Sequence, residues 1–320
     1  MSSRFRLQAR PAFFLLLLLF SWSGMVPVLQ AGERPLIFVS VVPQQYFVER
    51  IAGGLVDVQA MVKPGFSPHT YEPTPRQISQ LARADLYIRI GVPFEDSWMP
   101  RIRGVNPDMP VLDGRTGLKL LPVMANAAEA AGPDDKAEAG QSRQTRFNRI
   151  DGHDHQHGNQ PDPHVWTSPR IVVQMSEQIL AALESLLPQH KAELEQNRQQ
   201  FVAELQTLDQ ALTGQFAAIP NKRFMVFHPS WGYLADTYGL TQVAIEADGK
   251  EPGARALAQL IDTAKAQGIK SIFVQPQFDS RMAGQVAQAI GGRVEAIDPL
   301  EYEYFDMMHR AANLIAGTAP

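Results

Sequence analysis

One long helical pattern near the middle of the 320-residue chain constrains its fold more than any other feature. Apolar residues recur there at spacings of seven, four, three, four and four, at Leu194, Phe201, Leu205, Leu208, Leu212 and Phe216. This spacing keeps them on one face of a helix. It predicts a single helix over residues 188–219, about 30 residues and thus ~45 Å long. A helix of this length is typical of a rigid connector between two lobes.

Short apolar runs alternate with helical patterns on both sides of this segment. The runs are LIFVSV (36–41), DVQAMV (57–62), LYIRIG (86–91), MPVLDG (109–114), RFMVFH (223–228), TQVAIEA (241–247), SIFVQP (271–276) and RVEAID (293–298). Such alternation is typical of parallel sheets covered by helices. We therefore predict an α/β fold of two lobes, 32–187 and 220–320. Each has a parallel sheet flanked by helices, and the long rigid helix joins them.

Two helix starts are marked in the sequence. Thr74, Pro75 and Gln77 occupy the positions of a capping box, and Ser168–Pro169 precedes a second helical pattern. Between these helices, residues 125–162 are rich in Ala, Gly, Asp, Gln and Arg without apolar periodicity. We interpret them as a mobile insertion in the N-terminal lobe.

The N-terminus has the layout of a secretory signal. Three arginines precede the apolar run 13–20, and the small residue Ala31 closes the sequence VPVLQA. This predicts a signal peptide over residues 1–31, cleaved after Ala31. The alternative is a membrane anchor, but an apolar run this short does not span a bilayer, which needs about 20 residues.

The composition indicates the compartment and the partners. The chain has no cysteine, so neither disulfides nor a lipid-modified cysteine are expected. Its net charge of −4 becomes −7 once residues 1–31, with three arginines and no acidic residue, are removed. A negative charge disfavours nucleic acid as a partner. We therefore expect a monomeric periplasmic protein without a lipid anchor.

Four side chains able to bind a metal lie in short Pro-containing segments: SPHTYEP (67–73), DPHVW (162–166), VFHPSW (226–231) and AIDPLEYEY (296–304). They are His69, His164, His228 and Asp298. His228 and Asp298 end predicted strands, at the sheet edge where α/β proteins bind ligands. Each of the four is next to a proline, which stiffens the backbone that presents it.

Taken singly, each of these residues has a simpler interpretation. A histidine at a strand end is commonly a hydrogen-bonded structural residue, and Asp-Pro after a strand is commonly a turn. Only the combination of two such residues from each lobe, at the same kind of sheet edge, makes a candidate metal site.

The segments SPHTYEPTPRQI, DPHVWTSP, VFHPSWGYLADTYGL and IDPLEYEYFDMM resemble the motifs of the periplasmic solute-binding proteins of zinc and manganese ABC importers. The resemblance extends over essentially all of residues 36–317. It implies that His69, His164, His228 and Asp298 are the metal ligands, two from each lobe across a cleft. It also implies a membrane permease as partner, and lobes that move only slightly because the connecting helix is stiff.

The chain departs from this pattern beside the cleft. Relatives often carry Glu where this chain has Gln275, and many have glycine in the segment after Asp298, which here reads EYEYFDMM. The loss of a charge at Gln275 leaves the surroundings of the ligands open. Glu72 is a further candidate for orienting His69, although a role in helix entry explains it equally well.

Three histidines and one aspartate favour zinc, because imidazole binds zinc well and four ligands fill a tetrahedral shell. Manganese prefers oxygen ligands. In the family that the chain resembles, a Glu in place of the third histidine accompanies manganese, and position 228 is His. We therefore predict Zn²⁺ as the transported ligand, with Mn²⁺ or ferrous iron as the alternative. Ligand type alone does not exclude copper.

The insertion holds a second group of histidines, His153, His155 and His157, in the sequence HDHQH. Flanking glycines and alternation with Asp and Gln imply no fixed cage. We interpret them as a loose, low-affinity loop that collects zinc, a feature that resembling zinc proteins often have at this place. The alternative is a solvated surface loop without a specific role.

Three function classes follow from these observations. The first is a periplasmic high-affinity zinc-binding protein that delivers Zn²⁺ to an ABC importer permease. A zinc hydrolase is disfavoured because catalytic zinc keeps an open position, whereas Asp298 would close the shell, and no HExxH motif is present. A surface adhesin is disfavoured because a cysteine for lipid anchoring is missing. We predict that the chain is not an enzyme.

Overall fold

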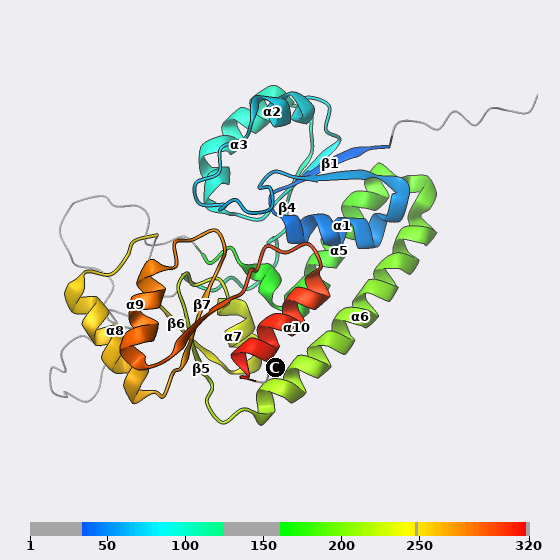
Figure 1. The fold of residues 1–320 in the computed structure, drawn as a ribbon. Coiled ribbons are helices and arrows are strands. Elements are labelled where there is room, and N and C mark those ends of the chain that lie inside the picture. The colour runs from blue at the N-terminus through cyan, green and yellow to red at the C-terminus, as the bar shows by residue number, and fades with distance from the viewer. Residues whose placement is uncertain (1–33, 124–160, 247–248, 318–320) are drawn as a thin grey trace, which may run out of the picture. The chain divides into compact units, whose positions relative to one another are not determined.

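Two four-stranded parallel sheets form the framework of the chain (Figure 1). The first has the order β2-β1-β3-β4 and the second has the equivalent order β6-β5-β7-β8. Their strands are β1 (Leu36–Val39), β2 (Asp57–Ala60), β3 (Leu86–Arg89), β4 (Val111–Asp113), β5 (Arg223–Val226), β6 (Thr241–Ala244), β7 (Ser271–Val274) and β8 (Arg293–Ala296). The predicted α/β class with a parallel sheet in each lobe is confirmed.

This computed structural model describes residues 34–123, 161–246 and 249–317. These described residues all belong to one compact unit, so the two lobes are not separate bodies. The predicted signal peptide lies outside the described residues. Within the described part, no helix combines the length and the apolar character that crossing a membrane requires.

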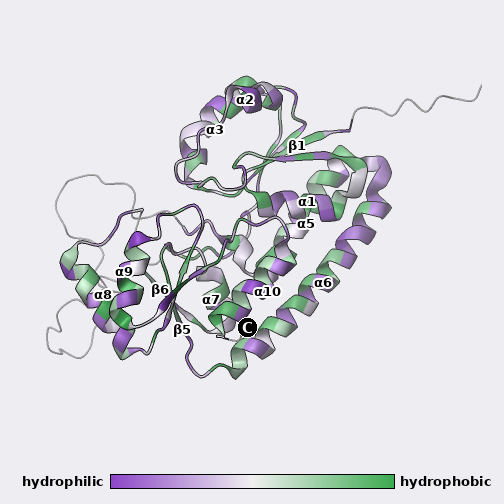
Figure 2. Ribbon diagram, viewed as in Figure 1, coloured by the Kyte–Doolittle hydropathy of each residue, from purple (hydrophilic) through white to green (hydrophobic). Residues whose placement is uncertain are grey.

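Helices connect successive strands and cover the sheets. They are α1 (Val42–Ala52), α2 (Pro75–Leu81), α3 (Pro93–Val105), α5 (Pro169–Leu186), α6 (Lys191–Ala218), α7 (Gly232–Tyr238), α8 (Ala254–Ala266), α9 (Arg281–Ile290) and α10 (Tyr304–Ile315), with short 3-10 turns η1 (Gly53–Leu55), η2 (Val165–Thr167) and η3 (Pro188–His190). Hydrophobic and hydrophilic residues alternate along the helices (Figure 2).

The long helix α6 spans 28 residues, and its buried residues are the six that the sequence pattern picks out. The predicted start is wrong by three residues, because residues 188–190 form the 3-10 turn η3. Proline at 188 and the non-helical backbone of His190 explain this difference. Helix α6 packs against α1, α5, α7 and α10 (Figure 1).

A single apolar core runs through both lobes. It extends from the first sheet along α6 to one face of the second sheet, where Phe224 and Val226 join it. A smaller cluster, including Ile272 and Leu260, fills the other face of the second sheet beneath α8 and α9. The connecting helix is therefore a structural part of both lobes rather than a free linker.

Local signals in the sequence predict the starts of α2 and α5 but do not predict α3. The capping box at α2 forms as predicted, since the Thr74 hydroxyl accepts a hydrogen bond from the Gln77 backbone N–H at 3.3 Å. Helix α5 begins at Pro169 as predicted. Helix α3 was not predicted, because Pro100 lies within it and proline disfavours helix interiors.

Candidate metal centre

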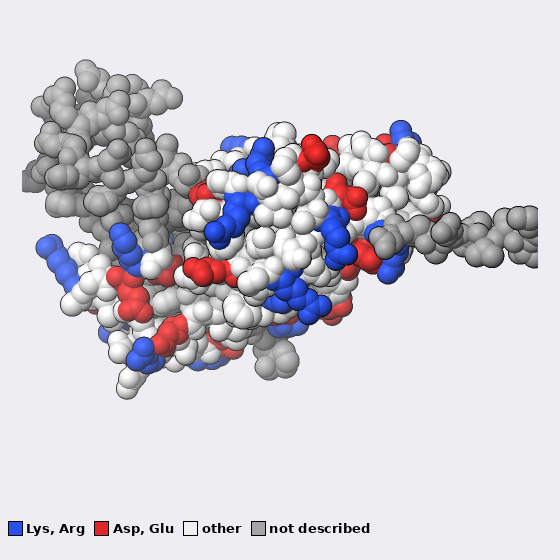
Figure 3. Space-filling model, turned by 90° about the horizontal axis from the view of Figure 1, so that it is seen from above, with Lys and Arg blue, Asp and Glu red and all other residues white. Residues whose placement is uncertain are grey.

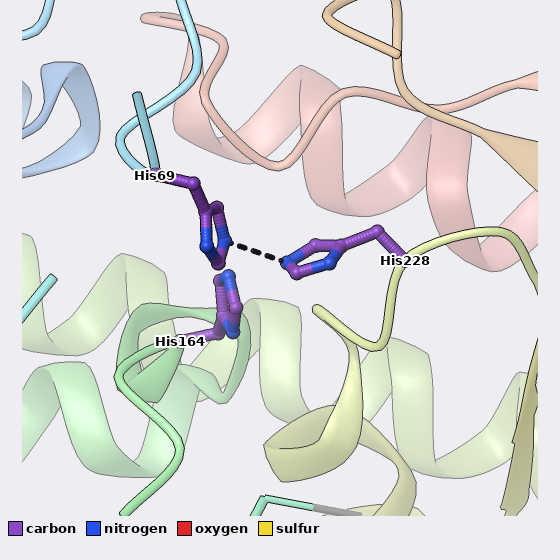
Figure 4. Close-up of side chains that lie close together, drawn as sticks. All are labelled: His69, His164 and His228. Carbon is purple, nitrogen blue, oxygen red and sulfur yellow. Dashed lines mark hydrogen bonds between the residues drawn. The ribbon is translucent and has the colours of Figure 1, made fainter. Parts of the chain in front are cut away.

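Three histidines from three separate segments point toward one another (Figure 4). His69 follows β2, His164 directly precedes η2, and His228 comes two residues after β5. One ring nitrogen of each lies within 4.8 Å of the others. The Nε2 atoms of His69 and His228 are 3.1 Å apart. The structure thus brings three of the four predicted ligands together.

His69 is presented by a loop that is fixed at its base. Its backbone N–H donates to the Ser67 hydroxyl at 3.2 Å, and the Pro68 carbonyl accepts a hydrogen bond from the Phe94 N–H of α3 at 3.2 Å. Burial, followed by the charges that His228 and His164 would carry, lowers the pKa of His69 to about 3. The imidazole is therefore neutral at physiological pH, as metal binding requires.

His164 is held by a carboxylate two residues before it. One oxygen of Asp162, Oδ1, accepts from the His164 backbone N–H at 2.9 Å and lies 2.7 Å from the ring Nδ1. Both side chains are buried. The sequence places Asp162 at the end of the insertion 125–162, whereas the structure describes Pro161 and Asp162 as part of the centre.

His228 is held in the same way by a carboxylate from the neighbouring strand. Glu246, just after β6, forms a short hydrogen bond with the Nδ1 of His228. The ring of Phe278 stacks on the other side of His228, with centroids 5.0 Å apart and an interplanar angle of 22°. Burial lowers the pKa of His228, although the hydrogen bond to the Glu246 carboxylate acts in the opposite direction.

The two carboxylates fix the orientation of the His164 and His228 rings. When Nδ1 carries the proton and donates it to a carboxylate, Nε2 keeps a lone pair and faces the centre. Sequence analysis missed the roles of both Asp162 and Glu246. Asp162 could have been suspected from its place in the DPH motif. Glu246 follows β6 and reaches His228 because β6 pairs with β5, which the spacing along the chain does not reveal.

Asp298 is not among the three residues whose ligand atoms cluster. Its Oδ1 accepts from the Leu300 backbone N–H at 2.9 Å, and its Oδ2 accepts from the Gln277 Nε2 at 2.8 Å. Burial raises the pKa of this carboxyl group. The structure therefore does not bring the fourth predicted ligand into the histidine cluster, and its carboxylate is hydrogen-bonded within its own lobe.

The two residues expected to orient the ligands differ in their surroundings. Gln275 is buried and donates a hydrogen bond to the hydroxyl of Ser230, two residues after His228, so it contacts the histidine segment indirectly. Glu72 is exposed, and among the described residues it has no hydrogen-bond or ion-pair partner. The structure gives no contact through which Glu72 would orient His69.

A cavity of about 230 Å³ opens beside the histidines. Its lining includes all three of them together with Asp96, Val123 and Pro161. Residues 124–160, with His153, His155 and His157, lie outside the described residues. The two flanks of this segment meet at the cavity, where Pro122 and Pro161 form an isolated antiparallel bridge.

Three imidazoles converging on one point form a nitrogen-rich site. Such a site suits zinc and other late transition metals better than ions that prefer oxygen ligands. Because two of the rings are fixed by carboxylates, the geometry is largely set before an ion arrives.

Comparison with known proteins adds independent information. Residues 37–318 match the family described as "ZnuA: Zinc-uptake complex component A periplasmic". The high-affinity zinc uptake system protein ZnuA of Bacillus subtilis is 28% identical over 272 residues, which cover 84% of this chain and 80% of that protein. A crystal structure of ZnuA is 34% identical, with a TM-score of 0.76, and covers 89% of this chain and 99% of its own.

A longer relative is the zinc-binding lipoprotein AdcA of Streptococcus pneumoniae (strain ATCC BAA-255 / R6). It is 27% identical over 279 residues, covering 85% of this chain but 51% of AdcA. The chain thus spans about half the length of this curated relative. The family is one of solute-binding transport components rather than enzymes, as predicted. Because the family match covers most of the 320 residues and includes all three clustered histidines, the chain belongs to the family of periplasmic components of zinc-uptake complexes.

Proposed function

We propose that the protein captures Zn²⁺ outside the cytoplasm and delivers it to the permease of an ABC importer. The observation that carries this proposal is the convergence of three buried or half-buried histidines from both lobes. Two of them are held by carboxylates, and the names of ZnuA and AdcA refer to zinc uptake and zinc binding. The proposed ligands are His69, His164 and His228, with Asp298 as the fourth once it moves from its present partners.

The proposed metal is zinc rather than manganese or iron. Three imidazole nitrogens favour zinc, whereas manganese is bound best by several oxygen ligands. With Asp298 added, the shell would be four-coordinate, which is typical of closed zinc sites. Release requires a change at the ligand loops. We propose that docking of the permease on both lobes supplies this change, with only slight movement of the lobes.

The proposed location is the periplasm, reached through a signal peptide over residues 1–31. AdcA is named a lipoprotein, whereas this sequence contains no cysteine for acylation. We propose a monomer that does not bind nucleic acid. The net charge of −4 and the interspersed acidic and basic side chains on the face shown in Figure 3 support the absence of a nucleic-acid partner.

The histidines of the insertion form a proposed accessory site that collects zinc for the centre. The flanks of the insertion line the cavity, which supports this role. Replacement of His153, His155 and His157 by Ala should remove weak secondary binding of zinc and leave the tight site intact. A comparable loss of tight binding in this triple variant would contradict the division into two sites.

The test is competitive calorimetric titration of the exported protein with zinc and manganese at neutral pH. We expect one tight zinc site and much weaker manganese binding, and His228→Ala should abolish the tight phase. Manganese binding as tight as zinc would favour the manganese alternative. Wild-type affinity in His228→Ala would refute the three-histidine centre.

A further inference from the structure

We propose that Gln277 is a positioning residue that holds the Asp298 carboxylate away from the histidine cluster and competes with the bound ion for it. This inference rests on the proposed function, and it concerns how the fourth ligand is controlled. Gln277 thereby sets the affinity and the release rate of the site rather than contributing a ligand.

The two residues meet because their loops leave neighbouring strands. β7 and β8 are paired in parallel, with Val274 beside Ala296, so the loops that follow begin side by side at the same sheet edge. Gln277 comes three residues after β7, and Asp298 comes two residues after β8. Their side chains are joined by the hydrogen bond of 2.8 Å from Nε2 to Oδ2.

Both carboxylate oxygens of Asp298 are occupied in this arrangement. Oδ1 accepts from the backbone N–H of Leu300, within the turn that Asp298 itself begins. That bond is local and moves with the turn, whereas the bond to Gln277 joins two different loops. The carboxylate lies outside the histidine cluster. To reach an ion held by the three histidines it must leave this position, and with it the Gln277 amide, so the amide and the ion compete for the carboxylate.

The Gln277 amide is held only through this bond. Its Oε1 is buried and has no hydrogen-bond partner among the described residues. In contrast, Gln275 in the same loop is bonded to Ser230, and Phe278 stacks on His228. Contacts of the neighbouring side chains therefore hold the loop on both sides of Gln277. The Gln277 amide has one hydrogen-bond partner among the described residues, Asp298, and it loses this partner when the carboxylate moves to the ion.

The consequence is a fourth ligand that binds only after the ion has reached the histidines. Three histidines bind the incoming ion, and Asp298 completes the shell when it exchanges Gln277 for the metal. In the reverse direction, Gln277 recaptures the carboxylate and lowers the barrier to release. Removal of the competing amide should therefore tighten zinc binding and slow dissociation.

The experiment measures zinc affinity and chelator-driven zinc release for wild type, Gln277→Ala, Asp298→Ala and the double variant. Gln277→Met is included because it keeps the side-chain length without a donor. We expect Gln277→Ala and Gln277→Met to bind zinc more tightly by about tenfold, because the carboxylate no longer gives up a charge-assisted hydrogen bond when it moves to the ion. The double variant should match Asp298→Ala, because Gln277 acts only through Asp298.

Cobalt(II) supplies a readout that a general structural effect would not produce. The visible spectrum reports coordination geometry, so Asp298→Ala and the double variant should share an altered spectrum, while Gln277→Ala keeps the wild-type form. Gln285→Ala, an exposed glutamine on α9, serves as the control and should match wild type.

Unchanged or weaker zinc binding in both Gln277 variants would overturn the inference, as would an equal effect of Gln277→Ala with and without Asp298. Its failure is distinct from failure of the proposed function. If His228→Ala bound zinc as tightly as wild type, the histidine centre itself would be wrong, whatever the Gln277 variants showed.

Discussion

At the scale of single residues, two carboxylates hold rings of the centre without belonging to the histidine cluster. Asp162 and Glu246 each lie against the Nδ1 of one histidine and are almost completely buried. His69, by contrast, has no carboxylate at Nδ1 among the described residues. Two rings are thus fixed by hydrogen bonds, and the third depends on its loop.

Removal of either carboxylate should weaken zinc binding although every ligand remains. We expect Asp162→Ala or Glu246→Gln to lower zinc affinity by about 10- to 100-fold, because the ring loses the partner that sets its tautomer and orientation. Competitive titration against a chelator measures this. The control is Glu193→Gln on the surface of α6, and wild-type affinity in Glu246→Gln would contradict the assigned role.

The lowered pKa of His69 should make the metal-free protein less stable in acid. Its pKa is about 3 in the folded chain, against an ordinary value of 6.5. Between these values the unfolded chain binds a proton that the folded chain does not, so the free energy of unfolding falls as pH falls from 6.5 toward 3. Above pH 6.5 this residue adds no pH dependence.

Urea unfolding at pH 7 and pH 5 tests this expectation without metal. His69→Ala should flatten the decrease in the free energy of unfolding relative to wild type. His309→Ala, at an exposed position on α10, should leave the decrease unchanged. An equal pH dependence in wild type and His69→Ala would show that His69 is not the titrating group.

At the scale of elements, the first residue of α7, Gly232, lies against the carboxylate of Asp162. A Cβ on Gly232 would lie 2.7 Å from the Oδ2 of Asp162, too close for any ordinary contact. Glycine at the start of α7 therefore lets Asp162 approach and hold His164. The sequence of this helix is thus linked to the metal centre although it supplies no ligand.

Gly232→Ala should weaken zinc binding and lower stability, because the new methyl group displaces Asp162. The matched control is Gly214→Ala in α6, where a Cβ meets nothing within 4 Å. That control should raise the free energy of unfolding by about 0.5–1 kcal/mol through helix propensity and leave zinc binding unchanged. Wild-type zinc affinity in Gly232→Ala, measured by titration, would refute the close-approach argument.

The sequence predicted the elements well where a local pattern determines them. Helix α6, the capping box at Thr74 and the strand ends that carry His228 and Asp298 all follow from periodicity and position. Partners across the fold could not be predicted. Glu246 reaches His228 because β6 lies beside β5, and Gln277 reaches Asp298 because β7 lies beside β8. Spacing along the chain does not reveal this order.

At the scale of the whole molecule, the two lobes share one apolar core along α6. Segments near the ligands join the lobes further: the Trp166 indole N–H donates to the Pro299 carbonyl at 2.7 Å, and the Tyr304 hydroxyl donates to the Trp166 carbonyl at 2.9 Å. All of these groups are buried. His164 and Asp298 are thus carried by segments that contact each other directly.

The shared core predicts that the lobes unfold together. We expect a single thermal transition, coincident by circular dichroism and by tryptophan fluorescence. Zinc should move the whole transition upward, by about 2.7 kcal/mol in free energy when free zinc is 100 times the dissociation constant. Two separate transitions, with zinc affecting one alone, would show that the lobes are independent.

The most direct test of the three-histidine centre is zinc K-edge X-ray absorption of the exported protein loaded with one equivalent of zinc. The account predicts three imidazole nitrogens at about 2.0–2.1 Å and one oxygen that is lost from the Asp298→Ala spectrum. A shell with fewer than three imidazoles, or one unchanged in His228→Ala, would contradict it.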